Sequence, residues 1–138
     1  MTGTSKKRIV FVRCVLWFGI VADFINAMQY CFPDFWAPAL GVHPDQISPF
    51  TRFILVHAAA LMAAWTLLLL WADRKPVERR MVSLLTVPIA LGIGGSMLYL
   101  IAEGLISGAS SAIIAGPIIT AGLFLAAYFA ASSALRKA

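Results

Sequence analysis

Residues 56–71 read VHAAALMAAWTLLLLW, and this run decides the class of the chain. Apart from His57 and Thr66, every residue in it is apolar. A helix that crosses the hydrocarbon core of a bilayer needs ~20 mostly apolar residues. Upstream, Ser48 suits a helix N-cap and Pro49 suits the first helical position. We therefore predict a membrane-spanning helix over residues 49–72.

Three further apolar stretches match this one, over residues 9–32, 77–102 and 112–135. The chain has 138 residues, of which 61% are hydrophobic and 12% are charged, whereas a soluble domain carries about 25% charged residues. The apolar run of residues 9–32 is too long for a secretory signal, so we expect a retained first helix. The sequence predicts one all-α domain over residues 1–138, an integral membrane four-helix bundle with no separate soluble domain.

The connection after the first helix, residues 33–48, reads PDFWAPALGVHPDQIS. It is rich in proline, and Trp36 favours a membrane interface. We expect a short interfacial helix at about 34–40, capped by Gly41.

Basic residues form three clusters at predicted helix ends, and only Arg52 lies elsewhere. The clusters are Lys6, Lys7, Arg8 and Arg13; Arg74, Lys75, Arg79 and Arg80; and Arg136 and Lys137. With four spans, all three fall on one side of the membrane, which the positive-inside rule makes cytoplasmic. We expect cytoplasmic termini, and we attribute the net charge of +5 to topology and not to nucleic-acid binding.

The last two helices contain Pro88, Pro117 and several small residues. Small residues at spacing four allow helices to pack closely in membranes. Those of the last helix are Ala112, Gly116 and Thr120, followed by Gly122, Ala126 and Ala130. We expect them to pack inside the chain, with a dimer interface as the alternative.

Polar residues recur at one depth. Counting from the predicted outer ends, Asp23, His57, Ser96 and Thr120 each lie ~10–12 Å below the surface, at ~1.5 Å per helical residue. Polar groups are expensive within a membrane and often functional. Asp23 and His57 can meet between neighbouring helices as an ionisable pair that binds a cation, relays a proton or holds a polar head group. The alternative is a polar patch that only fixes helix packing.

The candidate site is an outward-facing polar pocket around this pair. Asn26 and Tyr30 share a helical face with Asp23, because successive members are three or four residues apart. The remaining candidates could line the mouth; they are Gln29, Arg52, Tyr99 and Glu103.

No motif points to a cofactor or a metal. His57 is the only histidine in a span, which argues against haem between helices, and Asp23, His43, His57 and Glu103 lack the spacing of a zinc site. Cys14 and Cys31 lie ~25 Å apart on one helix, so we expect no disulfide between them.

Three segments have a familiar pattern: FPDFWAPALGV after the first helix, PFTRFILVHAAALMAAW opening the second, and the basic link ADRKPVERR. In this layout the chain resembles the small four-helix bacterial inner-membrane families, including DoxX-like proteins. The resemblance implies a multi-pass protein of the bacterial inner membrane and carries over no functional residues.

Three functions fit the sequence. The first is a binding protein for a small ligand or lipid head group, or an accessory subunit of a larger membrane complex. The second is a proton-linked or ion transporter or channel, working as a homo-oligomer through Asp23 and His57. The third is a membrane enzyme that uses Asp23, His57 and Glu103 as acid–base groups, but the chain has no GxSxG, HExxH or P-loop motif.

Overall fold

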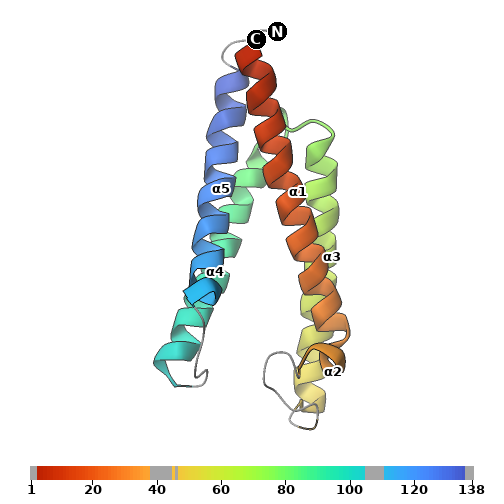
Figure 1. The fold of residues 1–138 in the computed structure, drawn as a ribbon. Coiled ribbons are helices and arrows are strands. Elements are labelled where there is room, and N and C mark those ends of the chain that lie inside the picture. The colour runs from red at the N-terminus through yellow and green to blue at the C-terminus, as the bar shows by residue number, and fades with distance from the viewer. Residues whose placement is uncertain (1–2, 38–44, 46, 105–110, 136–138) are drawn as a thin grey trace. The chain divides into compact units, whose positions relative to one another are not determined.

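The computed structural model describes residues 3–37, 45, 47–104 and 111–135, and this part of the chain contains helices and no strand. Figure 1 labels the helices of this part of the chain. They are α1 (Gly3–Cys31), α2 (Pro33–Trp36), α3 (Pro49–Asp73), α4 (Met81–Ala102) and α5 (Ser111–Leu135). All but α2 are long and apolar enough to cross a membrane. The prediction of an all-α chain with four membrane-length helices is confirmed.

Two helix starts differ from the prediction. Helix α1 begins at Gly3 and not at residue 9, so the basic residues before Ile9 continue the helix. Helix α4 begins at Met81 and not at residue 77. Between α3 and α4 the backbone forms turns: the Val82 N–H donates to the Arg79 carbonyl at 3.0 Å, and the Ser83 N–H donates to the Arg80 carbonyl at 3.1 Å. These three-residue bonds are tighter than those of an α-helix and delay its start.

The start of α3 is confirmed in detail. Pro49 is its first residue, and the Thr51 N–H donates to Ser48 Oγ at 3.1 Å, so Ser48 is the N-cap. In the connection before it, α2 is shorter than the predicted helix and ends at Trp36. The predicted cap, Gly41, lies outside the described residues.

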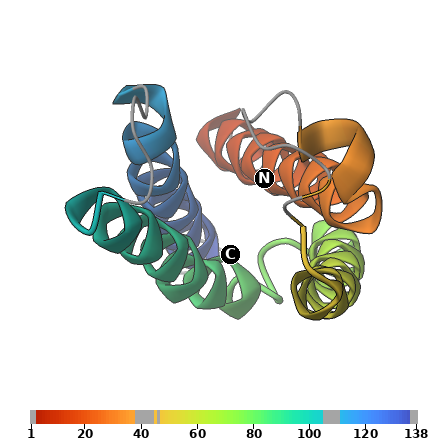
Figure 2. The same cartoon turned by 90° about the horizontal axis from the view of Figure 1, so that it is seen from below.

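The chain divides into two compact units. Unit 1 comprises Met1–Leu16 and Ala72–Ala138, and unit 2 comprises Trp17–Trp71. In unit 1, α4 and α5 lie side by side (Figures 1 and 2). Its fully buried side chains include Val12 on α1 and Phe124 and Ala127 on α5, with Ser83 of α4 also buried.

The small residues of α5 do not pack as predicted. The buried ones are Ala121, Ala127, Ala131 and Ala134, whereas Gly116, Gly122 and Ala126 are exposed in this chain. The expectation that these three pack inside the chain is therefore wrong. Phe124 explains the difference: its large side chain is fully buried, so the face that α5 buries is the one that carries Phe124.

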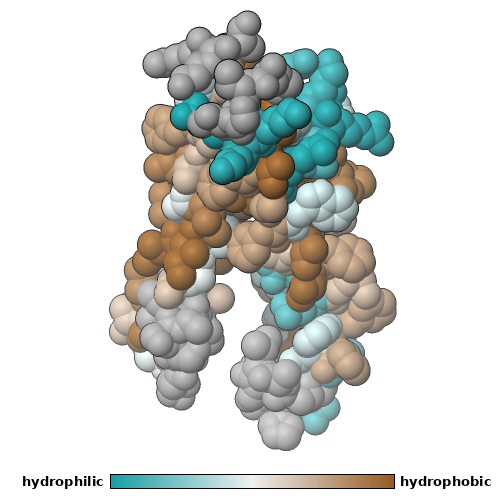
Figure 3. All heavy atoms as spheres, turned by 45° about the horizontal axis from the view of Figure 1, so that its top comes forward, coloured by the Kyte–Doolittle hydropathy of each residue, from teal (hydrophilic) through white to brown (hydrophobic). Residues whose placement is uncertain are grey.

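Charged residues gather at one end of unit 1. Figure 3 shows hydrophilic atoms there and hydrophobic atoms along the helices. This end carries the start of α1, the link of residues 74–80 and the end of α5 (Figure 1). Arg13 of α1 forms an ion pair with Asp73, the last residue of α3: its Nε lies 3.5 Å from Asp73 Oδ1. The Arg13 Nη2 also donates a hydrogen bond to the Asp73 carbonyl oxygen at 3.3 Å.

Candidate functional site

The polar face of α1 lies in unit 2 and is half-buried. It consists of Asp23, Asn26, Gln29 and Tyr30. Within the described part of the chain, none of these four side chains makes a hydrogen bond or an ion pair. Buried polar groups in native proteins are normally satisfied, and the hydrocarbon core offers no water to do so. This face therefore has unused capacity to bond to something outside the chain.

Among the described residues, the His57 ring makes its hydrogen bond within its own helix and not with Asp23. Its Nδ1 lies 2.8 Å from the carbonyl oxygen of Phe53, one turn earlier on the same helix. Because a carbonyl can only accept, Nδ1 is the donor of this bond. The imidazole also lies against the Phe53 ring, with centroids 4.2 Å apart. His57 is held by its own helix, and no hydrogen bond or ion pair joins it to Asp23 among the described residues.

Two other members of the predicted polar layer are satisfied locally. Ser96 Oγ donates to the Ile93 carbonyl at 2.9 Å, and Thr120 Oγ1 donates to the Gly116 carbonyl at 2.9 Å. Bonds of this kind are common for hydroxyls within helices. Ser96 and Thr120 therefore need no ligand.

The predicted site residues divide between the two units. Asp23, Asn26, Tyr30, Arg52 and His57 belong to unit 2, which contains residues 17–71. Tyr99 and Glu103 belong to unit 1, where both are exposed at the end of α4. The structure thus brings the first group into one unit and leaves the second group in the other.

Arg52 forms the shortest ion pair of the described chain, with Asp34. Nη1 lies 2.7 Å from Asp34 Oδ2, and Nη2 lies 2.6 Å from Oδ1. This two-bond geometry is the one that guanidinium and carboxylate groups favour. It fastens α2 to the first turn of α3. The hydrogen bond from Arg52, assisted by its charge, holds the pKa of the Asp34 carboxyl below its ordinary value.

Asp34 was not among the residues predicted for the site. A signal for it is present in the sequence. Arg52 is the one cation outside the three basic clusters, and Asp34 is an acid on the opposite side of the same short connection. A lone cation at one end of a connection and an acid at its other end are candidates to pair.

A pocket of about 200 Å³ lies beside this ion pair, within unit 2. Its walls come from the end of α1, from α2 and from the start of α3. They are formed by Gln29, Tyr30, Pro33, Trp36, Ala37, Ile47, Thr51 and Leu55. An apolar cavity of ~150 Å³ is large enough for benzene. The pocket therefore has room for a ring or a short chain. Two of its lining residues, Gln29 and Tyr30, carry an amide and a hydroxyl that are unpaired in the described part of the chain.

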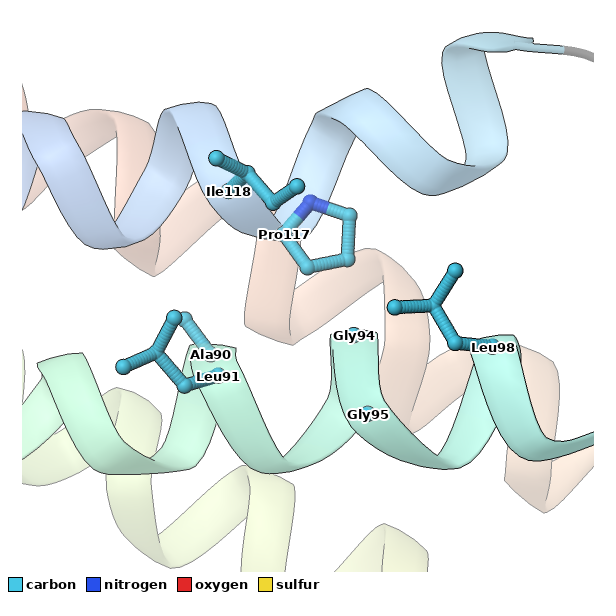
Figure 4. A pocket seen from close by; sticks show the side chains of 7 residues that line it. All are labelled: Ala90, Leu91, Gly94, Gly95, Leu98, Pro117 and Ile118. Carbon is cyan, nitrogen blue, oxygen red and sulfur yellow. The ribbon is translucent and has the colours of Figure 1, made fainter.

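A second pocket, of about 240 Å³, lies between α4 and α5 in unit 1 (Figure 4). Gly94 faces Pro117 across it. Its walls contain no charged or hydrogen-bonding side chain; they are formed by Ala90, Leu91, Gly94, Gly95, Leu98, Pro117 and Ile118. This pocket can accept apolar groups and has no side chain that would orient a polar one.

Metal chemistry and known relatives add nothing to this picture. Among the residues that the structure describes, no three histidine, cysteine, aspartate or glutamate side chains come together as metal ligands.

No family model, no curated protein and no solved structure matches the chain. The resemblance to DoxX-like proteins therefore stays a prediction.

Proposed function

We propose that this chain is a multi-pass protein of the bacterial inner membrane that binds a small amphiphilic molecule in the pocket of unit 2. One observation carries the proposal. The pocket has mainly apolar walls, yet two of the residues that line it, Gln29 and Tyr30, carry polar groups that no described residue satisfies. Ligand sites typically combine apolar walls with a few well-placed polar groups.

The chemistry of the walls defines the ligand class. The apolar part, a ring or short chain, would lie against Trp36 and Leu55. A hydroxyl, carbonyl or ester group would bond to the Gln29 amide and the Tyr30 hydroxyl. Membrane lipids supply both parts, so a lipid head-group region with its first methylenes is the ligand that fits best. We assign it the role of a binding or accessory protein, since no nucleophile with an adjacent base is found among the described residues that line the pocket.

The orientation follows from charge. Three basic clusters on one side of four spans favour cytoplasmic termini. The connection between α1 and α3 then faces outward and, with Trp36, lies at the outer interface. The pocket would open toward the outer leaflet.

Transport of a proton or cation by a homo-oligomer is the second candidate. Its support is Asp23, which is half-buried inside a span and has no partner among the described residues. An unpaired acid at this depth is a functional signal by default. A neighbouring copy would have to supply the partner, because His57 is bonded to Phe53.

Ligand binding is tested by extracting the purified protein and measuring co-purified small molecules by mass spectrometry. Leu55→Trp fills the pocket, whereas Leu61→Trp adds the same bulk to a side chain that is 70% exposed. We expect wild type and Leu61→Trp to carry the same amphiphile and Leu55→Trp to lose it. Equal loading of all three would refute the proposed site. Proton flux in liposomes that stops with Asp23→Asn would favour transport instead.

A further inference from the structure

The basic end of unit 1 has a surplus of cations over acids. Its described acids are Asp73 and Glu78, and both are paired: Asp73 with Arg13 at 3.5 Å and Glu78 with Lys75 at 2.9 Å. The cations without a carboxylate partner among the described residues are Lys6, Lys7, Arg8, Arg74 and Arg80. The cations of this surplus therefore have no carboxylate partner in the described chain and can bind an anion.

The height of these cations follows from the Arg13–Asp73 contact. Asp73 is the last residue of α3, so Arg13 marks the level at which α3 ends. Lys6, Lys7 and Arg8 precede Arg13 by five to seven residues, which places them ~8–10 Å beyond that level at ~1.5 Å per residue. Trp71, with 48% of its surface exposed, lies half a turn before Asp73, where tryptophan favours the membrane interface. The unpaired cations of α1 then reach the depth of lipid head groups.

Arg80 adds a local observation. Its Nη1 donates to the Val77 carbonyl at 3.4 Å, a long bond, and its Nε is buried with no hydrogen-bond partner. A guanidinium has five N–H donors and binds well to phosphate, whose oxygens accept these bonds. The turns of the link thus fix the position of Arg80 but leave hydrogen-bond donors of its guanidinium without a partner among the described residues.

We infer that this end of unit 1 is a binding surface for anionic phospholipid head groups in the adjacent leaflet. The phosphate oxygens would take the donors of Lys6, Lys7, Arg8, Arg74 and Arg80, while the acyl chains follow the exposed apolar side chains of the helices. The inference concerns a different unit from the proposed ligand pocket and does not depend on it. A surface of this kind prefers phosphatidylglycerol over phosphatidylcholine, because only the former carries net negative charge.

The test uses the full chain in neutral detergent, titrated with each lipid and followed by native mass spectrometry. Each basic residue near a membrane surface contributes about fivefold to anionic lipid binding. We expect phosphatidylglycerol to bind at least tenfold more tightly than phosphatidylcholine, with the preference falling as salt rises. Arg74→Gln should weaken phosphatidylglycerol about fivefold, and the triple variant Lys6→Gln, Lys7→Gln, Arg8→Gln should remove most of the preference. Detergent also makes the result independent of membrane topology.

Arg52→Gln is the matched control, since it removes one positive charge like Arg74→Gln. It lies ~30 Å from Asp73 along α3, at ~1.5 Å per residue, and is paired with Asp34. It should leave the lipid preference unchanged, and circular dichroism checks that each variant is folded. Equal binding of the two lipids, or an equal loss with Arg52→Gln, overturns the inference. Tighter binding of a short RNA than of phosphatidylglycerol overturns it too, because the surface would then serve a soluble polyanion.

Discussion

Replacing Gly94 by alanine should destabilise the packing of α4 against α5. A Cβ built on Gly94 would lie 3.2 Å from the Cβ of Pro117, closer than the ~3.5–4.0 Å of ordinary carbon contacts. Figure 4 shows the two residues facing each other across the helix pair. The proline ring is rigid and fixed to the backbone, so relief requires the helices to move apart.

The size of the effect follows from two opposing contributions. Overpacking a tight contact typically costs ~1–3 kcal/mol, while alanine in place of a helical glycine gains up to ~1 kcal/mol. Gly94→Ala should therefore lose ~0–2 kcal/mol of unfolding free energy. Gly92→Ala and Gly95→Ala meet nothing within 4 Å and should gain up to ~1 kcal/mol. The difference between Gly94→Ala and its neighbours, ~1–3 kcal/mol, is the quantity to measure.

The assay is reversible unfolding in mixed micelles of mild detergent and dodecyl sulfate, followed by circular dichroism. A second background isolates the contact: Pro117→Gly removes the atom that the new methyl group meets, so Gly94→Ala should no longer be costly there. If Gly94→Ala is as stable as Gly95→Ala in the chain that keeps Pro117, then α4 and α5 do not approach each other as closely as the structure shows.

Three further results are expected. The lowered pKa of Asp34 means that its pair with Arg52 stabilises the attachment of α2 above the ordinary aspartate pKa of ~3.9 and loses this effect as pH falls through the lowered value. The protection of the α2 amides, measured as the ratio of their intrinsic exchange rate to the observed rate at each pH, should therefore fall in acid, and in Asp34→Asn this protection should be low at every pH. Asp23→Asn and His57→Ala should be additive within ~0.5 kcal/mol in a double-mutant cycle of unfolding, and a larger coupling would show that the two side chains meet. Arg13→Gln should cost ~1 kcal/mol of unfolding free energy, a value discounted because Arg13 is half-exposed, and most of that cost should disappear in an Asp73→Asn background.

The secondary structure was predictable because apolar runs of this length have few alternatives. The N-cap at Ser48 followed from a local rule, and α3 begins where that rule places it. The start of α4 did not follow, since seven residues between two helices can be turns or helix, and the choice depends on tertiary placement of the Arg79 and Arg80 backbone.

The candidate site was only partly predictable, because depth along a helix does not fix direction around it. Asp23 and His57 were placed at one level, yet the imidazole turns back to its own helix. The Asp34–Arg52 pair joins residues 18 positions apart, and the conformation of the connection that brings them together leaves no periodic pattern. Periodicity identifies which residues share a face, but not which face meets another helix.

Many polar groups of the spanning helices are satisfied locally, and those that are not locate the functional question. Five hydroxyls bond to carbonyls of their own helix: Thr66, Thr86, Ser96, Thr120 and Ser133. Ser132 Oγ on α5 and Trp65 Nε1 on α3 are buried without a hydrogen-bond partner in the described part of the chain. The five hydroxyls need no partner, so selection for a ligand is unnecessary to explain them. The carboxylate, carboxamides and phenol of α1 in unit 2 have no such bond. Their side chains cannot be satisfied by hydrocarbon, so a ligand, a bound water or another chain must supply the partners. Because Gln29 and Tyr30 also line the pocket, a ligand seated there is a candidate partner for the half of this face nearer α2. Asp23 would then be left as the group that distinguishes simple binding from transport.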